Sequence, residues 1–224
     1  NGEGVDFSMR YFNSDGKEGT MCGNGGRCIS AYAYLKGIAG NDCSFMAIDG
    51  LHKAEIVDAQ AGKSHIRLKM KDVSFNGPFT DPMTLDTGSP HYVTFVSNIE
   101  NMDVNFLGRS IRNSAPYRES GINVNFAEVY SDYILLRTYE RGVENETLAC
   151  GTGATATAIS AYLKGIAQPG KPVNIHTRGG VLKVSFSHHP VESLFSDVWL
   201  EGPAEHVFSG EYYYEQSMTS ENEI

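Results

Sequence analysis

A segment that begins at Cys22 occurs a second time 128 residues later, at Cys150. From each cysteine, eighteen consecutive positions align without a gap, and ten of them are identical. Matches at this density are not expected by chance, so the chain is two copies of one strand, loop, helix, strand unit. A stretch rich in Pro and Asp, 77–87, predicts the boundary between two similar domains, 1–80 and 81–224.

The repeated segment has the pattern of a buried helix in both copies. Residues 23–35 and 151–163 are rich in Ala, Ser and Tyr, carry few charges and are followed by a Lys-Gly pair, which is typical of a helix end. Small side chains dominate both segments, so a sheet can approach them from several sides. Both helices are therefore expected to be enclosed by a curled sheet.

Strand patterns occupy much of the remaining chain. The 24 glycines separate short alternating apolar runs such as 5–12 and 134–139. The sequence therefore predicts an α+β fold of two pseudo-symmetric domains, each a curled, mostly antiparallel sheet wrapped around a central helix. A last strand, 205–213, is expected to close onto either domain.

Charge and composition exclude several classes of protein. Lys and Arg number 18 against 27 Asp and Glu, which gives a formal charge of -9, and the chain has no basic run, so a nucleic-acid binder is excluded. The uncharged stretch 148–163 is too short and too weakly apolar to span a membrane. The start at Asn1 has no pattern of an export signal, so we expect a cytoplasmic protein whose partner is a small molecule or another protein.

The four cysteines indicate neither a disulfide framework nor a zinc site. Cys22, Cys28, Cys43 and Cys150 are few and scattered, and none belongs to a C-x-x-C pair. A reducing compartment fits this usage, and Cys28 and Cys43 are expected to be small buried residues.

Each repeated cysteine comes directly before a Gly-rich helix start. The first N–H groups of a helix lack partners within the helix, and the positive end of its dipole lies there, so the turn is an anion site. This position favours the thiolate form, which makes Cys22 and Cys150 candidate acid–base groups. For either copy alone, the simpler interpretation is a small residue that fills a tight turn. Backbone donors for a carboxylate are available at Gly23, Asn24, Gly151 and Thr152.

The duplication changes this interpretation. A pseudo-twofold axis would place the two turns opposite each other, with two thiols and two helix termini converging on one point. One group would then remove a proton from one face of a carbon next to a carboxylate, while the other delivers a proton to the opposite face. The pair therefore predicts racemisation or epimerisation, with one sulfur as thiolate and the other as thiol in each direction.

The residues around both turns resemble diaminopimelate epimerase. The matching segments are 11–16 (YFNSDG), 21–28 (MCGNGGRC), 89–91 (SPH), 123–126 (NVNF), 140–142 (ERG) and 148–153 (LACGTG). The resemblance covers nearly all of the chain and implies two barrel-like sheets, each around a central helix, working without pyridoxal phosphate or a metal. The reaction that it implies interconverts LL- and meso-diaminopimelate for lysine and cell-wall synthesis.

The resemblance also implies a role for each site residue. Cys22 and Cys150 are the two bases, and His91 and Glu140 lie close to them and bias which sulfur is charged. Ser89, a further substrate-binding position, stands where the family commonly has Asn. The residues implied to bind the reacting carboxylate are Gly23, Asn24, Gly151 and Thr152, and those implied to hold the distal end of the substrate are Asn13, Asn123, Glu140 and Arg141.

Three other functions stay open at this point. A proline or hydroxyproline racemase also uses paired cysteines, but its first loop continues with Gly-His where this chain has Cys22-Gly23-Asn24. A hydrolase with a cysteine nucleophile and His91 as base explains one cysteine and leaves its duplicate unexplained. A redox or binding module with a switchable disulfide is the third. Only inversion in heavy water places deuterium at the α carbon of the product.

The two ends of the chain add two expectations. The tyrosine run 212–214 is expected to pack a terminal strand or a subunit contact, which leaves a homodimer open. The family begins with a further N-terminal segment that has no counterpart before Asn1, so part of the site is expected to be absent from this chain.

Overall fold

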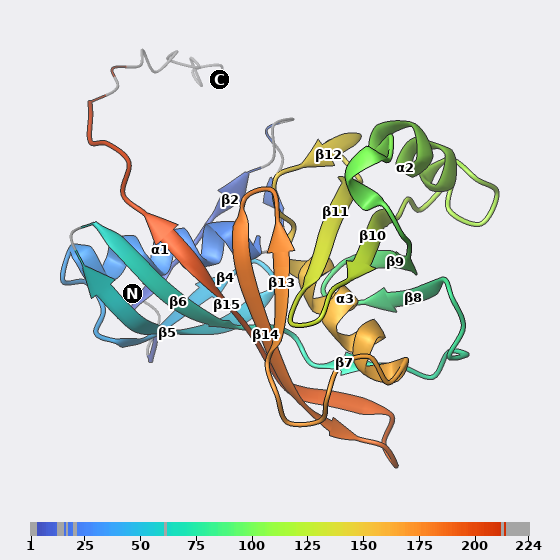
Figure 1. Ribbon diagram of the computed structural model, residues 1–224. Helices are drawn as coiled ribbons and strands as arrows, with labels where there is room; N and C mark the ends of the chain where they lie inside the picture. Colours follow the sequence, from blue (N-terminus) through green and yellow to red (C-terminus); the bar gives the residue numbers. More distant parts are fainter. Residues whose placement is uncertain are drawn as a thin grey trace, which may run out of the picture.

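The computed structural model describes residues 4–12, 16, 18–19, 22–60, 62–211 and 213. Figure 1 shows a large twisted sheet around α1 and α3, with α2 on the outside. The predicted α+β class is confirmed. The helices are α1 (Gly23–Leu35), α2 (Val104–Arg112) and α3 (Gly151–Leu163), with a short 3-10 helix at Ile99–Asn101. The strands are β1 (Phe7–Ser8), β2 (Tyr11–Phe12), β3 (Glu18–Gly19), β4 (Asp42–Ala47), β5 (Gly50–Gln60), β6 (Lys63–Lys69), β7 (Val73–Ser74), β8 (Met83–Asp86), β9 (Pro90–Phe95), β10 (Asn123–Val129), β11 (Ile134–Glu140), β12 (Asn145–Thr147), β13 (Val173–Thr177), β14 (Gly180–His189) and β15 (Leu194–Glu205).

One continuous sheet runs through both repeated halves. Its strand order is β1-β4-β5-β6-β15-β14-β13-β11-β10-β9-β8, with β7 paired to β15 and β12 paired to β11, while β2 and β3 form a separate hairpin. The link between the halves is β15, which pairs antiparallel with β14 on one edge and with β6 on the other. The two copies of the repeat therefore share a strand that belongs, by sequence, to the second copy.

The last strand ends earlier than the sequence pattern indicates. Its C-terminal residue is Glu205, and in the described residues 206–211 one backbone bond follows, from the N–H of His206 to the carbonyl of Gly62 at 2.8 Å. The side chains of Val207 and Phe208 are 83% and 82% exposed. Because these apolar side chains stay largely in water, burial contributes little to holding this segment to the sheet.

The α3 helix is enclosed on all sides, as expected from its composition. Ten of its thirteen residues are buried, and the four alanines Ala154, Ala156, Ala158 and Ala161 are fully inaccessible. Strands β8 to β11 and β13 to β15 contact it. Small side chains allow this close approach, so the helix lies inside the second half of the sheet.

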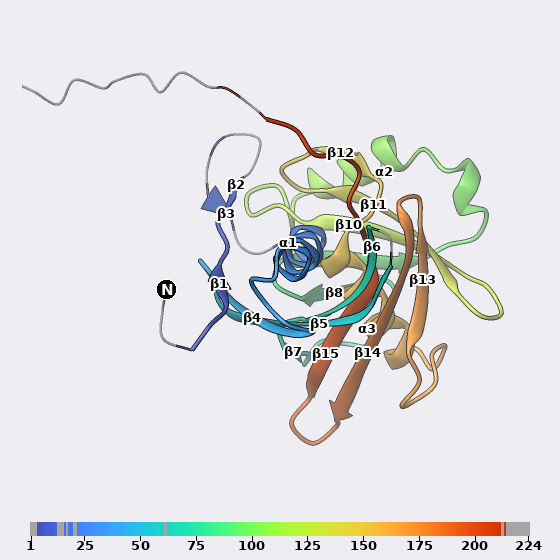
Figure 2. The ribbon, with the colours of Figure 1, turned by 90° about the vertical axis from the view of Figure 1, so that its left-hand side faces the viewer.

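The α1 helix is covered on one side only. Figure 2 shows it end-on, with β4, β5 and β6 curving around one face. Its buried residues are small or lie at its start, whereas Tyr32 and Leu35 are about half exposed, at 51% and 55%. The expectation of an enclosed helix therefore holds for α1 on its sheet-facing side alone.

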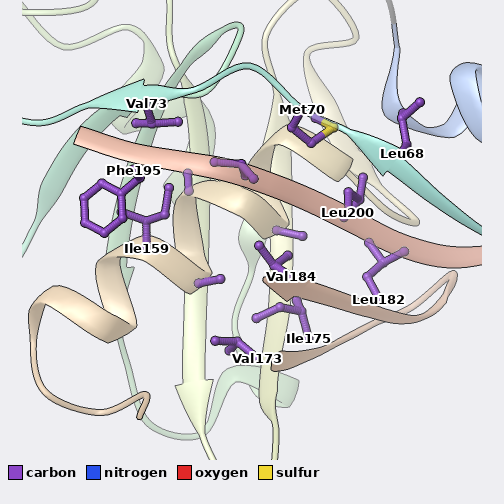
Figure 3. Close-up of a cluster of buried hydrophobic side chains, with 14 of the residues drawn as sticks. Leu68, Met70, Val73, Ile159, Val173, Ile175, Leu182, Val184, Phe195 and Leu200 are labelled. Atoms are coloured by element: carbon purple, nitrogen blue, oxygen red, sulfur yellow. The ribbon is translucent and has the colours of Figure 1, made fainter. Parts of the chain in front are cut away.

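The hydrophobic core is continuous between the halves. Figure 3 shows Ile159 of α3 beside Phe195 of β15, and Leu200 of the same strand near Leu182 and Val184. Full burial of a side chain of this size contributes about 1.5–3 kcal/mol, so removing Leu200 would weaken both halves together.

The α2 helix was not predicted from the sequence pattern. Its N-cap is Asp103, whose carboxylate accepts the N–H of Phe106 at 2.9 Å. It packs on β10 and β11, and a Cβ at Gly108 would lie 2.4 Å from the Cβ of Tyr139, so glycine is needed at this crossing. No helix in the described ranges is long and apolar enough to cross a membrane.

Candidate active site

The N-termini of α1 and α3 meet inside the protein. Cys22 and Cys150 are the N-cap residues of these helices, both with extended backbone. A Cβ built on Gly23 would lie 3.4 Å from the Cα of Gly151, and the reverse distance is also 3.4 Å. Leu200 of β15 covers both glycines, with its Cδ2 3.2 Å from the Cβ position of Gly23 and 2.7 Å from that of Gly151. The close approach of the two helix termini therefore depends on residues without side chains.

Both cysteine turns open into one cleft of about 910 Å³. Cys22 and Cys150 line it together, so the structure brings the two predicted acid–base residues to a shared space. His91 is fully buried and lies outside this lining, and Asn13 falls outside the described residues. The other predicted residues that line the cleft are Gly23, Asn24, Ser89, Asn123, Glu140, Arg141, Gly151 and Thr152.

The sulfur of Cys150 lies in a buried cap. It accepts the backbone N–H of Gly153 at 3.4 Å and lies 3.4 Å from the hydroxyl oxygen of Thr152. Burial, and then the charge of Glu140, raise the pKa of the Cys150 thiol to about 12, against the opposing effect of the hydrogen bonds from Thr152 and Gly153. The helix terminus alone would favour the thiolate, but removal of the sulfur from water outweighs it. Cys150 is therefore a thiol at neutral pH.

Glu140, the last residue of β11, places its carboxyl group beside Cys150. Antiparallel pairing of β12 with β11 brings the Thr147 hydroxyl to this carboxyl group, to which it donates a hydrogen bond. Burial raises the pKa of Glu140, and hydrogen bonds from Thr147 and the Cys150 thiol lower it in part. The carboxyl group of Glu140 thus accepts hydrogen bonds from both neighbours, and its charge contributes to the raised pKa of the Cys150 thiol.

Cys22 lies in a different electrostatic environment. It is half-buried, and the Tyr11 side chain is close enough that charge on Cys22, together with burial and a hydrogen bond to Cys22, raises the pKa of Tyr11. Arg27, near the start of α1, is buried, and this burial lowers its pKa while negative charge at Cys28 and Cys22 opposes the shift. A hydroxyl donor and a cation therefore face Cys22, whereas a carboxylate faces Cys150.

Arg27 and Asn24 bridge the two cysteine turns. The guanidinium donates to the Gly23 carbonyl at 3.2 Å and to Oδ1 of Asn24 at 2.9 Å. The Nδ2 of Asn24 then donates to the carbonyl of Ala149 at 3.1 Å, directly before Cys150. The side chain of Asn24 is thus used within the protein, which leaves the backbone N–H of this residue as its free donor at the start of α1. Sequence reasoning missed Arg27, although it is the one charged residue of α1.

Asn123 and Arg141 form another part of the cleft wall. The Nδ2 of Asn123 donates to the Pro90 carbonyl at 3.1 Å and to the Ser89 hydroxyl at 3.0 Å, and its Oδ1 accepts the N–H of Arg141 at 2.9 Å. The Arg141 side chain donates to the Ser120 carbonyl at 2.9 Å and is exposed to the cleft. A fixed guanidinium of this kind suits a carboxylate.

His91 lies behind this wall and holds two of its hydroxyl groups. Its Nε2 is 2.9 Å from the Thr152 hydroxyl and 3.1 Å from that of Ser89, and its Nδ1 is 3.0 Å from the amide nitrogen of Asn125. Burial, and then the charge of Arg141, lower the pKa of His91 to about 3. The ring is therefore neutral at physiological pH. Asn125 lies in the NVNF segment at 123–126, but the sequence predicted no role for it.

Solved structures share this fold at low sequence identity. A PhzF-family phenazine biosynthesis protein from Bacillus anthracis superposes with a TM-score of 0.64 and 14% identity, covering 92% of this chain and 82% of that one. A probable proline racemase from Agrobacterium radiobacter superposes with a TM-score of 0.63 and 15% identity, covering 93% and 74%. These similarities establish the fold of the chain, a fold that a probable proline racemase and a PhzF-family protein also have.

Sequence comparison then identifies the family. The family model for diaminopimelate epimerase matches residues 2–75 and 83–206. A diaminopimelate epimerase from Flavobacterium psychrophilum is 46% identical over 209 residues, which cover 93% of this chain and 79% of that protein. The chain belongs to the diaminopimelate epimerase family, which confirms the resemblance and is consistent with a function in lysine biosynthesis.

Proposed function

We propose that the chain interconverts LL- and meso-diaminopimelate with Cys22 and Cys150 as its acid–base pair. The observation that carries the proposal is the contact between two repeated helix N-termini, each capped by a cysteine, at one cleft. The α-carboxylate binds at these termini, where unpaired N–H groups and the positive ends of two helix dipoles favour an anion. The α carbon then lies between the two cysteine side chains.

Inversion takes two proton transfers on opposite faces of that carbon. The thiolate of Cys22 removes the α proton, and the electron pair left on carbon delocalises into the bound carboxylate. The thiol of Cys150 gives its proton to the opposite face, which leaves the charge on Cys150. In the reverse direction the two residues exchange roles. Losing one preorganised donor of this type costs roughly 10²–10³-fold in rate, so the helix N–H groups are a major contribution.

The two sulfurs have different surroundings. The buried cation of Arg27 and the Tyr11 hydroxyl lie on its side. Cys150 is buried and faces the carboxyl group of Glu140, which holds its thiol in the protonated form. The thiol of Cys150 is therefore available to deliver a proton in the direction in which Cys22 removes one.

The far wall of the cleft supports a substrate with a second charged end. Arg141 lines the cleft with a guanidinium that donates to the Ser120 carbonyl, and Asn123 holds the backbone of Arg141 in place. A proline substrate has no second carboxylate for that guanidinium to bind. The volume of about 910 Å³ also exceeds what a single small ring needs, so the longer diaminopimelate fits the site better.

A cysteine hydrolase is a weaker candidate for this site. The ring of His91 is bonded to Thr152 and Ser89, and the Thr152 hydroxyl stands between it and the sulfur of Cys150. With its pKa lowered to about 3, His91 does not take up a proton at neutral pH.

The thiols of Cys22 and Cys150 are both free, which fits work in a reducing cytoplasm.

Isotope exchange tests the proposal. Incubation of LL-diaminopimelate in heavy water is expected to place one deuterium at the α carbon of the meso product, read by mass spectrometry. Changing Cys22→Ser and Cys150→Ser singly is expected to abolish epimerisation while substrate binding, measured by calorimetry, is retained. Cys43→Ser serves as a matched control, because this buried cysteine lies outside the cleft lining. Full turnover by either cleft variant would refute the paired-base assignment.

A further inference from the structure

Asn125 is a buried polar side chain that the reaction scheme does not use. It lies on β10, is fully inaccessible, and is absent from the cleft lining. Its Nδ2 is 2.9 Å from the carbonyl of Tyr92 and 3.0 Å from Nδ1 of His91, and its Oδ1 accepts the hydroxyl of Thr138 at 2.9 Å. A Cβ at Gly153 would lie 2.4 Å from that Oδ1, so α3 packs directly on this amide.

The Tyr92 carbonyl fixes which way the amide points. A backbone carbonyl only accepts hydrogen bonds, so the group of Asn125 that faces it is the NH2. The same NH2 faces Nδ1 of His91, which must therefore present its lone pair. Because the ring is neutral, its single N–H is on Nε2. The tautomer of His91 follows from the orientation of Asn125.

This tautomer sets the direction of the next hydrogen bonds. The Nε2–H donates to the Thr152 hydroxyl oxygen at 2.9 Å and approaches that of Ser89 at 3.1 Å. Neither hydroxyl can donate back to a ring nitrogen that carries hydrogen. In the part of the chain that the structure describes, the other hydrogen-bond neighbour of the Thr152 hydroxyl is the sulfur of Cys150, at 3.4 Å. The hydroxyl hydrogen of Thr152 is therefore directed at that sulfur.

We propose that Asn125 is a positioning residue, which fixes His91 as the Nε2–H tautomer and thereby makes Thr152 a hydrogen-bond donor to Cys150. The inference rests on the proposed function only in treating Cys150 as a reacting group. Each time Cys150 has given up its proton, the Thr152 donor stabilises the resulting thiolate. Asn125 of β10, His91 of β9, Thr152 of α3 and Cys150, the N-cap of α3, thus form one directed chain of hydrogen bonds.

Ser89 is affected by the same chain. Its oxygen accepts from Nδ2 of Asn123 at 3.0 Å and faces the Nε2–H of His91, so its own hydrogen is free to point into the cleft. The serine hydroxyl is therefore a donor toward the substrate. The amide that the family commonly has at this position would offer a donor in a similar place.

Other groups act on Cys150 from neighbouring elements and are unchanged by a substitution at Asn125. They are the carboxyl group of Glu140 on β11, the charge at Cys22 before α1, and the backbone N–H of Gly153 in α3. Arg141 acts on the His91 ring through its charge. Of the groups that act directly on Cys150, the Thr152 hydroxyl is the one whose direction changes with the ring tautomer.

The first test reads the tautomer directly. Nitrogen-15 NMR of histidine-labelled, ligand-free protein is expected to show His91 with a proton on Nε2, its signal being identified by its loss in His91→Gln. A ring with its proton on Nδ1 would overturn the inference, even if the cysteine variants support the two-base mechanism. This readout needs no turnover, so its failure and a failure of the proposed function are separate results.

The second test reverses the donor. Asn125→Asp keeps the shape but presents an oxygen to Nδ1 of His91, so the ring proton is expected on Nδ1 and the Thr152 hydroxyl then donates to Nε2 instead of to sulfur. Alkylation of Cys150 by iodoacetamide near pH 9, followed by peptide mass spectrometry, is expected to slow about 10- to 100-fold, from the strength of a hydrogen bond to a charged group. Alkylation of Cys22 in the same sample serves as the internal reference.

The kinetic effect of the same variant separates positioning from general damage. We expect kcat to fall by about the same factor and KM to change less, because the backbone donors of the two helix termini and the Arg141 guanidinium are not altered. Thr138→Val is the matched control: it also removes a hydrogen bond to Asn125 but leaves the NH2 held by the Tyr92 carbonyl, so the tautomer is expected to stay Nε2–H. An Asn125→Asp protein that folds and alkylates at the original rate contradicts the inference. If Asn125→Asp does not fold, the nitrogen-15 NMR measurement of the His91 tautomer in the unaltered protein still tests the inference.

Discussion

Replacing Glu140 with Gln removes the negative charge next to the Cys150 sulfur at nearly constant side-chain size. With its pKa raised to about 12, the Cys150 thiol is ionised in roughly one molecule in 10⁴ at pH 8. A neighbouring like charge typically accounts for about 1–3 pKa units, equivalent to about 1.4–4 kcal/mol. Loss of that charge favours the thiolate, so the pKa of Cys150 is expected to fall and its thiolate fraction at pH 8 to rise about 10- to 1,000-fold.

The assay is the rate of Cys150 alkylation by iodoacetamide as a function of pH, read on the Cys150 peptide by mass spectrometry. Glu140→Asp is the matched control, because it keeps the charge and is expected to keep the rate low. Initial epimerisation rates in the two directions are expected to change unequally in Glu140→Gln, since the thiol form of Cys150 is the proton donor in only one of them. An unchanged or slower alkylation in Glu140→Gln would refute the assignment of Glu140 as the charge that holds this thiol protonated.

Two further predictions concern packing and acid stability. In Gly151→Ala the new methyl group lies 2.7 Å from the Cδ2 of Leu200, a fully buried side chain, so we expect a loss of about 1–3 kcal/mol in urea unfolding and a larger loss of activity, because the helix termini move apart. Gly40→Ala is the control, because a Cβ there meets nothing within 4 Å, and it is expected to change neither stability nor activity. Equal effects of the two substitutions would contradict the role of the Gly151 contact with Leu200. The pKa of His91 is lowered from 6.5 to about 3, so between these values the unfolded chain binds a proton that the folded protein does not. The free energy of unfolding is therefore expected to fall by about 5 kcal/mol as the pH drops through this range, and His91→Gln is expected to flatten that dependence; parallel curves for the two proteins would contradict the assignment.

The two central helices were predictable to their terminal residues because both copies carry the same signals. In each, a cysteine turn precedes the first helical glycine and a Lys-Gly pair follows the last leucine. The α2 helix has no counterpart in the other half and mixes charged residues with Gly108, so neither repetition nor composition indicated it. Its position depends on contacts with β10 and β11, which a local pattern does not contain.

The first predicted strand shows how tertiary contacts divide a local pattern. Residues 5–12 alternate like one strand, but β1 pairs parallel with β4 whereas β2 pairs with β3 in a separate hairpin. Between them Met9 turns inward, and its Cε lies 3.2 Å from the Cβ position of Gly25 on α1. A buried contact with a helix later in the chain therefore interrupts the run.

In the candidate site, too, the sequence predicted the residues on local motifs but not the contacts between distant segments. The cysteines and their neighbouring donors lie on local motifs, so the sequence indicated them. The roles of Arg27 and Asn125 depend on partners that are distant in sequence: Pro203 for the former, Tyr92 and His91 for the latter. Such hydrogen-bond directions arise only when strands from different parts of the chain are side by side.

The shared strand β15 limits how this duplicated protein can come apart or move. It is bonded along one edge to β6 and along the other to β14, and Leu200 in its middle packs over both helix starts. Neither half is therefore expected to be a free-standing folding unit, since a fragment ending near residue 80 would leave the β6 edge without its partner. The two halves are joined through a continuous sheet and not through a flexible linker, so we expect the cleft to widen by a change in the twist of that sheet. Such a change would also distort the backbone of β15.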